Sequence, residues 1–155
     1  MTTFVKNPIK TLSLIHLVMV AGPLLVGTIL YLNTDIKMDG SIGDDIFVYV
    51  FPLMALVGIF SSKYIYNILL NNLKKNDDLQ QKLVGYQTAS FVKWGLLEGP
   101  ALLNIMWFST NGNLLFLTVG GTLLVFLFVQ RPTKSKIENE LELKGEHKRA
   151  FDRLD

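Results

Sequence analysis

The sequence predicts an all-α integral membrane protein, a bundle of four transmembrane helices. Half of the 155 residues are apolar, the mean hydropathy is +0.35, and 18% of the residues are charged. A soluble domain of this size usually carries about a quarter charged residues. The charges also collect at 35–45, 74–82 and 131–155, and the long stretches between them hold almost none. This uneven distribution is typical of membrane spans.

Four apolar segments approach or exceed the length that a helix needs to cross the hydrocarbon core, about 17–25 residues. We expect spans at 11–32, 46–70, 88–109 and 114–130, which together make a transmembrane domain at 1–132. The fourth span is the shortest and is expected to stand nearly upright. The first is too long for a signal peptide, and no small-residue cleavage site follows it, so we interpret it as a retained helix.

Local signals set the ends of the third and fourth helices. The turn Asn111–Asn113 holds Gly112, which can adopt positive φ, and predicts an antiparallel hairpin. Arg131-Pro132 is expected to stop the fourth helix. The charged segment 133–155 carries a weak helical stripe of Ile137, Leu141, Phe151 and Leu154. It is either an amphipathic segment on the membrane or on a partner, or a solvated cytoplasmic tail, which we favour.

The distribution of Lys and Arg predicts the orientation of the spans. The N-terminal segment, the second loop and the C-terminal tail together carry 12 basic residues, whereas the first and third loops carry only Lys37. Because basic loops stay on the cytoplasmic side, both termini are expected in the cytoplasm. The acidic stretch 39–45 lacks the ligand spacing of a calcium loop and is expected to be a solvated outer loop.

The first and third spans match at an offset of 77 residues. Gly22-Pro23 falls on Gly99-Pro100, and Thr11 and Ser13 fall on Thr88 and Ser90. The match predicts two repeated helical hairpins, or it is a chance similarity between apolar helices. A proline inside a helix removes one hydrogen bond and kinks it, so we expect kinks at Pro23 and Pro100.

A single acid, Glu98, stands near the middle of the third span. A carboxylate is costly in an apolar medium unless it is paired or protonated. His16 and Asn104 are the other polar groups expected at a comparable depth. Lys93 is expected about 7.5 Å nearer the cytoplasm, on a helix face that it does not share with Glu98. Three interpretations stay open: a neutral, hydrogen-bonded link between helices, a partner of a cation such as His16 or Lys93, and a proton or cation site that turns over.

The stretch 86–108, "YQTASFVKWGLLEGPALLNIMWF", and the "RPT" that ends the last span resemble a family of small, uncharacterised four-span proteins of the bacterial inner membrane. The resemblance covers most of the chain and implies no activity. A weaker similarity joins "GLLEGPALL" at 95–103 to the acid-bearing helix of rotor-ring proteolipids of rotary ATPases. That similarity implies a proton- or ion-coupled role for Glu98, but the second span lacks the glycines of a ring helix.

Other function classes have no motif in this chain. It contains no cysteine, which excludes disulfides and thiolate metal sites, and no nucleophile–base set, phosphate loop or zinc-protease motif. The net charge of +2 is too small to predict nucleic-acid binding. We therefore expect a non-catalytic protein without cofactor or metal, multi-pass in the bacterial inner membrane. Its expected partners are the bilayer and other membrane proteins or copies of itself.

Overall fold

The computed structural model describes residues 8–37 and 46–153, which form six helices. Their bounds are Pro8–Asn33 (α1), Phe47–Lys74 (α2), Leu79–Asn111 (α3), Leu114–Val129 (α4), Lys134–Glu140 (α5) and Gly145–Asp152 (α6). These residues contain no strand, so the all-α prediction is confirmed for them. Each of the first four helices holds one predicted span. The acidic stretch 39–45 and Leu154 lie outside the described residues.

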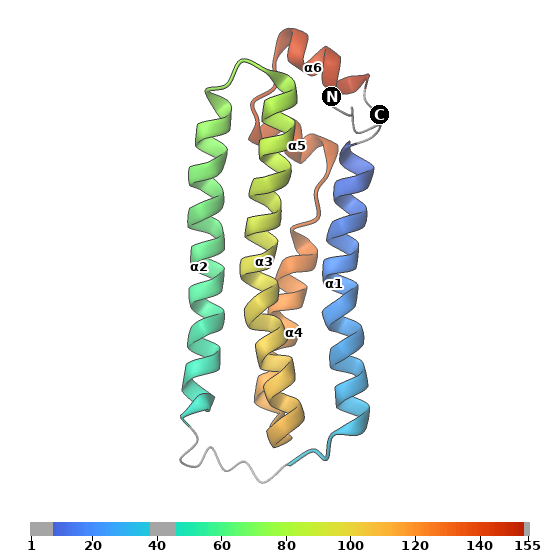
Figure 1. Ribbon diagram of the computed structural model, residues 1–155, viewed down its shortest axis with the longest axis vertical. Helices are drawn as coiled ribbons and strands as arrows, with labels where there is room; N and C mark the ends of the chain where they lie inside the picture. Colours follow the sequence, from blue (N-terminus) through green and yellow to red (C-terminus); the bar gives the residue numbers. More distant parts are fainter. Residues whose placement is uncertain (1–7, 38–45, 154–155) are drawn as a thin grey trace.

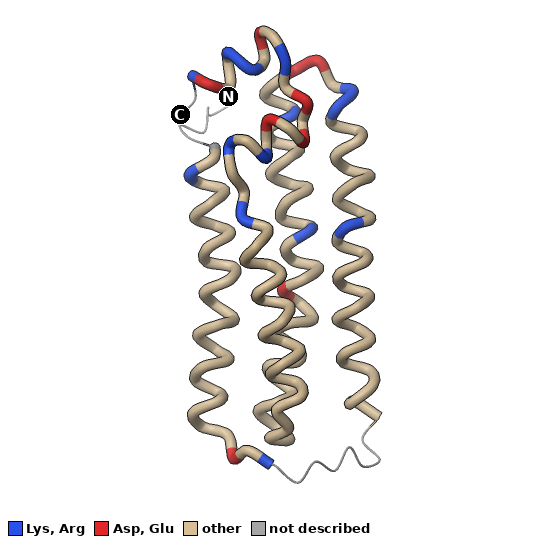
Figure 2. Tube along the Cα trace, turned by 180° about the vertical axis from the view of Figure 1, so that it is seen from behind, with Lys and Arg blue, Asp and Glu red and all other residues tan. Residues whose placement is uncertain are grey.

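The four long helices lie side by side, and α3 packs against each of the other three (Figure 1). The start of α1, the turn between α2 and α3, and helices α5 and α6 lie at one end of the bundle. Residues 34–37, which follow α1, and the turn between α3 and α4 lie at the other end. We call the first the basic end, because Figure 2 shows most of the Lys and Arg residues there, together with most of the acidic ones. We call the other the opposite end.

By length and composition, α1 and α2 could each cross a membrane. The pair α4 and α5 would add a third crossing, although its two helices meet at a bend of 82°. Helix α3 is not among these candidates, because Lys93, Glu98 and Asn104 lower its apolar character. The described structure thus contains two or three helices of membrane-spanning character, fewer than the four that the sequence pattern predicts.

Both turn signals behave as predicted. Gly112 ends α3 with φ of 73°, and its N–H donates to the carbonyl of Phe108 at 2.8 Å. The Asn113 side chain accepts from the N–H of Leu115 and caps α4. At its far end α4 stops at Val129, just before Arg131-Pro132.

Pro100 shapes the contact between α2 and α3. Proline has no N–H, so the carbonyl of Leu96 loses its partner within the helix. That carbonyl faces Gly58 of α2, where a built Cβ would lie 2.8 Å from the oxygen and 3.0 Å from Cγ of Pro100. Glycine at 58 therefore lets the two backbones approach where the proline disturbs α3. Both Pro23 and Pro100 lie within helices that continue past them.

Gly120 plays a similar part between α3 and α4. A Cβ built on it would lie 2.8 Å from the Ile105 side chain and 3.0 Å from the carbonyl of Ala101. The neighbouring Gly121 has open space around it. Of these two adjacent glycines, only Gly120 allows close packing between α3 and α4.

The prediction of a solvated tail is wrong for the described residues. Helices α5 and α6 fold back onto the bundle, and Ile137, Leu141, Leu143 and Phe151 are buried in the same core as residues of α1, α2 and α3. Three ion pairs lie at the surface of this segment: Lys74–Glu142 at 2.6 Å, Lys134–Asp152 at 3.2 Å and Lys148–Glu138 at 3.3 Å. The segment docks because these four apolar side chains are removed from water, while its charged side chains stay at the surface.

We expect Gly58→Ala to destabilise the bundle by about 1–3 kcal/mol, because the added methyl meets a backbone oxygen that has no room to move. The midpoint of thermal unfolding in detergent measures this. Gly121→Ala is the matched control, since it adds the same methyl to a helix surface with open space. Equal midpoints for the two variants would contradict the tight α2–α3 contact.

Candidate functional site

Glu98 is half-buried on α3, at the edge of the helix face that packs into the bundle. It lies one turn from the buried Trp94 and two turns from the buried Ile105, on the side that meets α1. No hydrogen bond or ion pair joins Glu98 to another of the described residues. The acid is therefore placed between packed helices without a polar partner from the described part of its own chain.

His16, one predicted partner of Glu98, is engaged elsewhere. It is 2% exposed, and its Nε2 donates to the carbonyl of Leu127 at 2.9 Å. Its ring also packs edge-on against Trp94, with the centroids 4.7 Å apart. His16 thus links α1 to both α4 and α3.

Lys93, the other predicted partner, points toward α2. Its Nζ lies 4.1 Å from the ring centroid of Tyr66, a cation–π contact. The prediction that Lys93 and Glu98 do not share a helix face agrees with this arrangement. The structure therefore does not bring Glu98, His16 and Lys93 together as one site.

Asn104 is fully buried between α3 and α4, next to Gly120. Its Nδ2 donates to the carbonyl of Pro100 at 2.8 Å, so it ties down the backbone just after the proline. Its Oδ1 has no hydrogen-bond partner among the described residues. An unmet buried acceptor costs about 1–3 kcal/mol, which marks this position as one that a water or another donor would stabilise.

One polar cluster, formed by residues of α2, α3 and α5, is not predicted by any pattern in the sequence. The hydroxyls of Tyr66 on α2 and Tyr86 on α3 both donate to Oε2 of Glu140 on α5, at 2.6 and 2.7 Å. Burial raises the pKa of Tyr86, and the adjacent carboxylate acts in the same direction, so the hydroxyl stays protonated and donates at neutral pH. We call Tyr66, Tyr86 and Glu140 the tyrosine clamp.

The clamp holds the C-terminal segment against the bundle. Hydrogen bonds to a charged acceptor are worth about 1.5–3 kcal/mol, more than bonds between neutral groups. Tyr66 and Tyr86 look like interfacial aromatics in the sequence, and only the stripe of Ile137 and Leu141 beside Glu140 indicates a buried face of α5. The clamp is a structural link, because its two hydroxyls and its carboxylate hydrogen-bond to one another.

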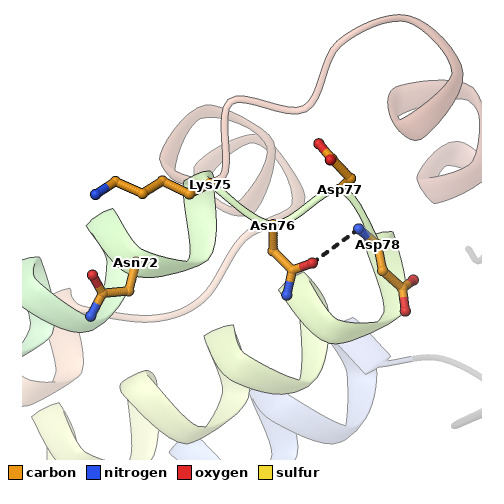
Figure 3. A pocket seen from close by; sticks show the side chains of 5 residues that line it. All are labelled: Asn72, Lys75, Asn76, Asp77 and Asp78. Carbon is orange, nitrogen blue, oxygen red and sulfur yellow. Dashed lines mark hydrogen bonds between the residues drawn. The ribbon is translucent and has the colours of Figure 1, made fainter.

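A second polar region is a surface pocket at the turn between α2 and α3, and its side chains do not point toward a common centre. The pocket is lined by Asn72, Lys75, Asn76, Asp77 and Asp78. Figure 3 shows the side chains of Lys75, Asp77 and Asp78 pointing in different directions. The Asn76 Oδ1 accepts from the N–H of Asp78 at 3.2 Å, which shapes the turn before α3. Within the described residues there is also no group of three His, Cys, Asp or Glu side chains placed to hold a metal ion.

Comparisons of the chain with protein-family models, with curated proteins and with solved structures find no match. The two resemblances drawn from the sequence therefore remain predictions.

We expect Glu140→Ala to release the C-terminal segment, because two buried tyrosine hydroxyls lose their shared acceptor. Trypsin cleavage after Lys134 and Lys136 should accelerate by roughly ten- to a hundredfold, from about 1.5–3 kcal/mol of lost bonding. Glu146→Ala removes an exposed carboxylate from α6 and serves as the control. If both variants are cleaved at the wild-type rate, the clamp does not hold the segment.

Proposed function

We propose that this protein is a four-span, non-catalytic component of the bacterial cytoplasmic membrane, which works by associating with other membrane helices. The observation that carries membrane insertion is the broad apolar surface of α1, α2 and α4. Large apolar side chains on all three helices are strongly exposed, among them Leu32 at 75%, Phe60 at 70% and Val129 at 73%. A soluble monomer rarely exposes an apolar area of this extent.

The polar groups of α3 do not exclude it as a span, because the other helices cover it. Lys93 contacts Tyr66 on α2, and the buried Asn104 lies against α4. The hydropathy of α3 is thus lowered mainly by side chains that do not face lipid. A helix enclosed by its neighbours tolerates such groups at membrane depth.

The length of the bundle between the start of α2 and the end of α4 is close to the thickness of a membrane. We call this part of the bundle the hydrocarbon slab. His16 contacts both Trp94 and Leu127, and helix α4 ends two residues beyond Leu127. Tyr66 on α2 lies near the height at which α4 ends, because it contacts Lys93, the residue before Trp94. The helical rise from Phe47 to Tyr66 is about 29 Å, close to the thickness of the hydrocarbon core, about 30 Å. The basic end then projects into the cytoplasm.

The association part of the proposal is supported by Glu98. A half-buried acid without a polar partner in the described chain needs a donor or cation from elsewhere. The outer surface of α3 beside it carries Gly95 and Gly99, four residues apart and with open space around both. Small residues at this spacing allow another helix to approach closely. A second copy or a partner subunit docked there would bring a polar group to Glu98.

A rival function is favoured by the same observation. A carboxyl that is not committed to a structural bond is free to take up and release a proton or bind a cation. The rival is therefore a proton- or cation-coupled membrane protein that works through Glu98, as the similarity to ring proteolipids implies.

The first test concerns insertion and orientation. The chain has no cysteine, so Ser41→Cys and Ser135→Cys can be labelled singly in intact cells with a membrane-impermeant thiol reagent. We expect labelling at 41 and none at 135 until the cells are opened, because the basic end stays in the cytoplasm. Labelling at 135 alone would reverse the orientation, and labelling at both in intact cells would contradict the four-span arrangement.

The second test separates the two roles of Glu98. For an intermolecular link, Glu98→Gln should keep assembly because it retains hydrogen bonding, whereas Glu98→Leu should weaken it by about 1–2 kcal/mol per lost bond. Native mass spectrometry of the purified protein measures the assembled fraction. Leu25→Ala, at an exposed position on α1, is the control for loss of apolar area outside the proposed docking surface.

For the rival, Glu98→Gln should abolish proton uptake by reconstituted vesicles while assembly survives. Assembly unchanged in Glu98→Leu, together with proton uptake unchanged in Glu98→Gln, would refute both roles.

A further inference from the structure

Three lysines from three helices act on one another near Tyr66 at the basic end of the bundle. Lys93 on α3 lies over the ring, with Nζ 4.1 Å from its centroid. Lys63 precedes Tyr66 by three residues, so both project from neighbouring positions on α2. Lys136 precedes Glu140 by four residues on α5, and Glu140 accepts the Tyr66 hydroxyl at 2.6 Å. Lys63 and Lys136 are both close enough to act electrostatically on Lys93.

The positive charge of this group is poorly balanced. None of the three lysines forms an ion pair with a carboxylate of the described residues. Glu140 is the one described acid that acts on Lys93, and its Oε2 already accepts two tyrosine hydroxyls. Two ammonium groups and one carboxylate thus act on Lys93. Other lysines of the same end form surface ion pairs with acids.

The three lysines also stand at one depth, where α4 ends. The ammonium of Lys136 is 3.5 Å from the carbonyl of Gln130, the last residue of that helix turn. Lys63 and the neighbouring Tyr64, which is 69% exposed, lie on the outer surface of α2. Two exposed aromatic side chains lie near the lysines along the chain: Phe60 stands one turn before Tyr64 on α2, and Phe128 stands two residues before Gln130 on α4. Cations therefore meet a lipid-like surface at the inner edge of the proposed hydrocarbon slab.

We propose that Lys63, Lys93 and Lys136 bind the phosphate of an anionic phospholipid from the inner leaflet. Phospholipid phosphates lie just outside the hydrocarbon core, which is where lysine side chains extend when their stems lie along apolar surface. Basic pockets between membrane helices on the cytoplasmic side bind anionic headgroups in this way. The lipid is a better occupant than a free anion, because its acyl chains would cover Phe60 and Phe128. This inference rests on the proposed membrane insertion.

The test uses the full-length protein purified in a non-ionic detergent. Native mass spectrometry and thermal unfolding are followed while phosphatidylglycerol, phosphatidylcholine or inorganic phosphate is added. We expect the wild type to retain phosphatidylglycerol, and its unfolding midpoint to rise more with this lipid than with the other two. The double variant Lys63→Gln/Lys136→Gln should weaken the apparent affinity by about tenfold or more, since each lysine near the surface contributes to the attraction.

The matched control is Lys37→Gln/Lys75→Gln, which removes two lysines outside the cluster. The double test variant leaves Lys93 and the tyrosine clamp intact, so its folding is checked by an unchanged unfolding midpoint without lipid. Equal weakening by the control would overturn the site, and an equal effect of inorganic phosphate would assign it to a free anion.

Carbonate washing of membranes tests membrane insertion separately from lipid binding. A chain that is released from the membrane would contradict the proposed insertion. A chain that stays inserted but shows no preference for the anionic lipid would contradict this inference alone.

Discussion

Helix α3 carries polar groups that an apolar environment tolerates only when they are covered, and the arrangement of the bundle follows from this constraint. The carbonyl freed by Pro100 meets Gly58 of α2, and Asn104 is enclosed beside Gly120 of α4. His16 of α1 packs on Trp94. Each neighbour thus contributes a small or polar residue at its contact with α3, which packs against all three of the other long helices.

The shortness of α4 explains the C-terminal segment. Helix α2 continues about 12 Å beyond Tyr66, whereas α4 ends near that level. The faces of α2 and α3 that α4 leaves uncovered are apolar at Leu70 and aromatic at Tyr86. Helices α5 and α6 fill this place, and Glu140 satisfies the two hydroxyls that burial would otherwise leave unpaired. The turn at Arg131-Pro132 therefore directs the chain from α4 across the basic end of the bundle, where α5 and α6 pack.

The parts of this structure that could be predicted from the sequence are those with local causes. Span-length apolar runs give the helices, and Gly112 and Pro132 mark two of their ends. The tyrosine clamp could not be predicted, because its bonds join residues 74 and 54 positions apart and leave no periodic pattern. The partners expected for Glu98 followed from positions along the sequence, which do not say where the side chains of His16 and Lys93 point in the folded bundle.

That directional information decides what Glu98 can do. His16 commits its Nε2 proton to the carbonyl of Leu127, and Lys93 is held over Tyr66, so neither is placed to exchange a proton directly with the acid. A proton path through Glu98 would have to be completed by water or by another chain, since one acid is not a relay. A neutral carboxyl needs only one donor and one acceptor, which a single docked helix can supply beside Gly95 and Gly99. Association therefore demands less of the surroundings than coupling does, and it is the simpler account of an acid at this position.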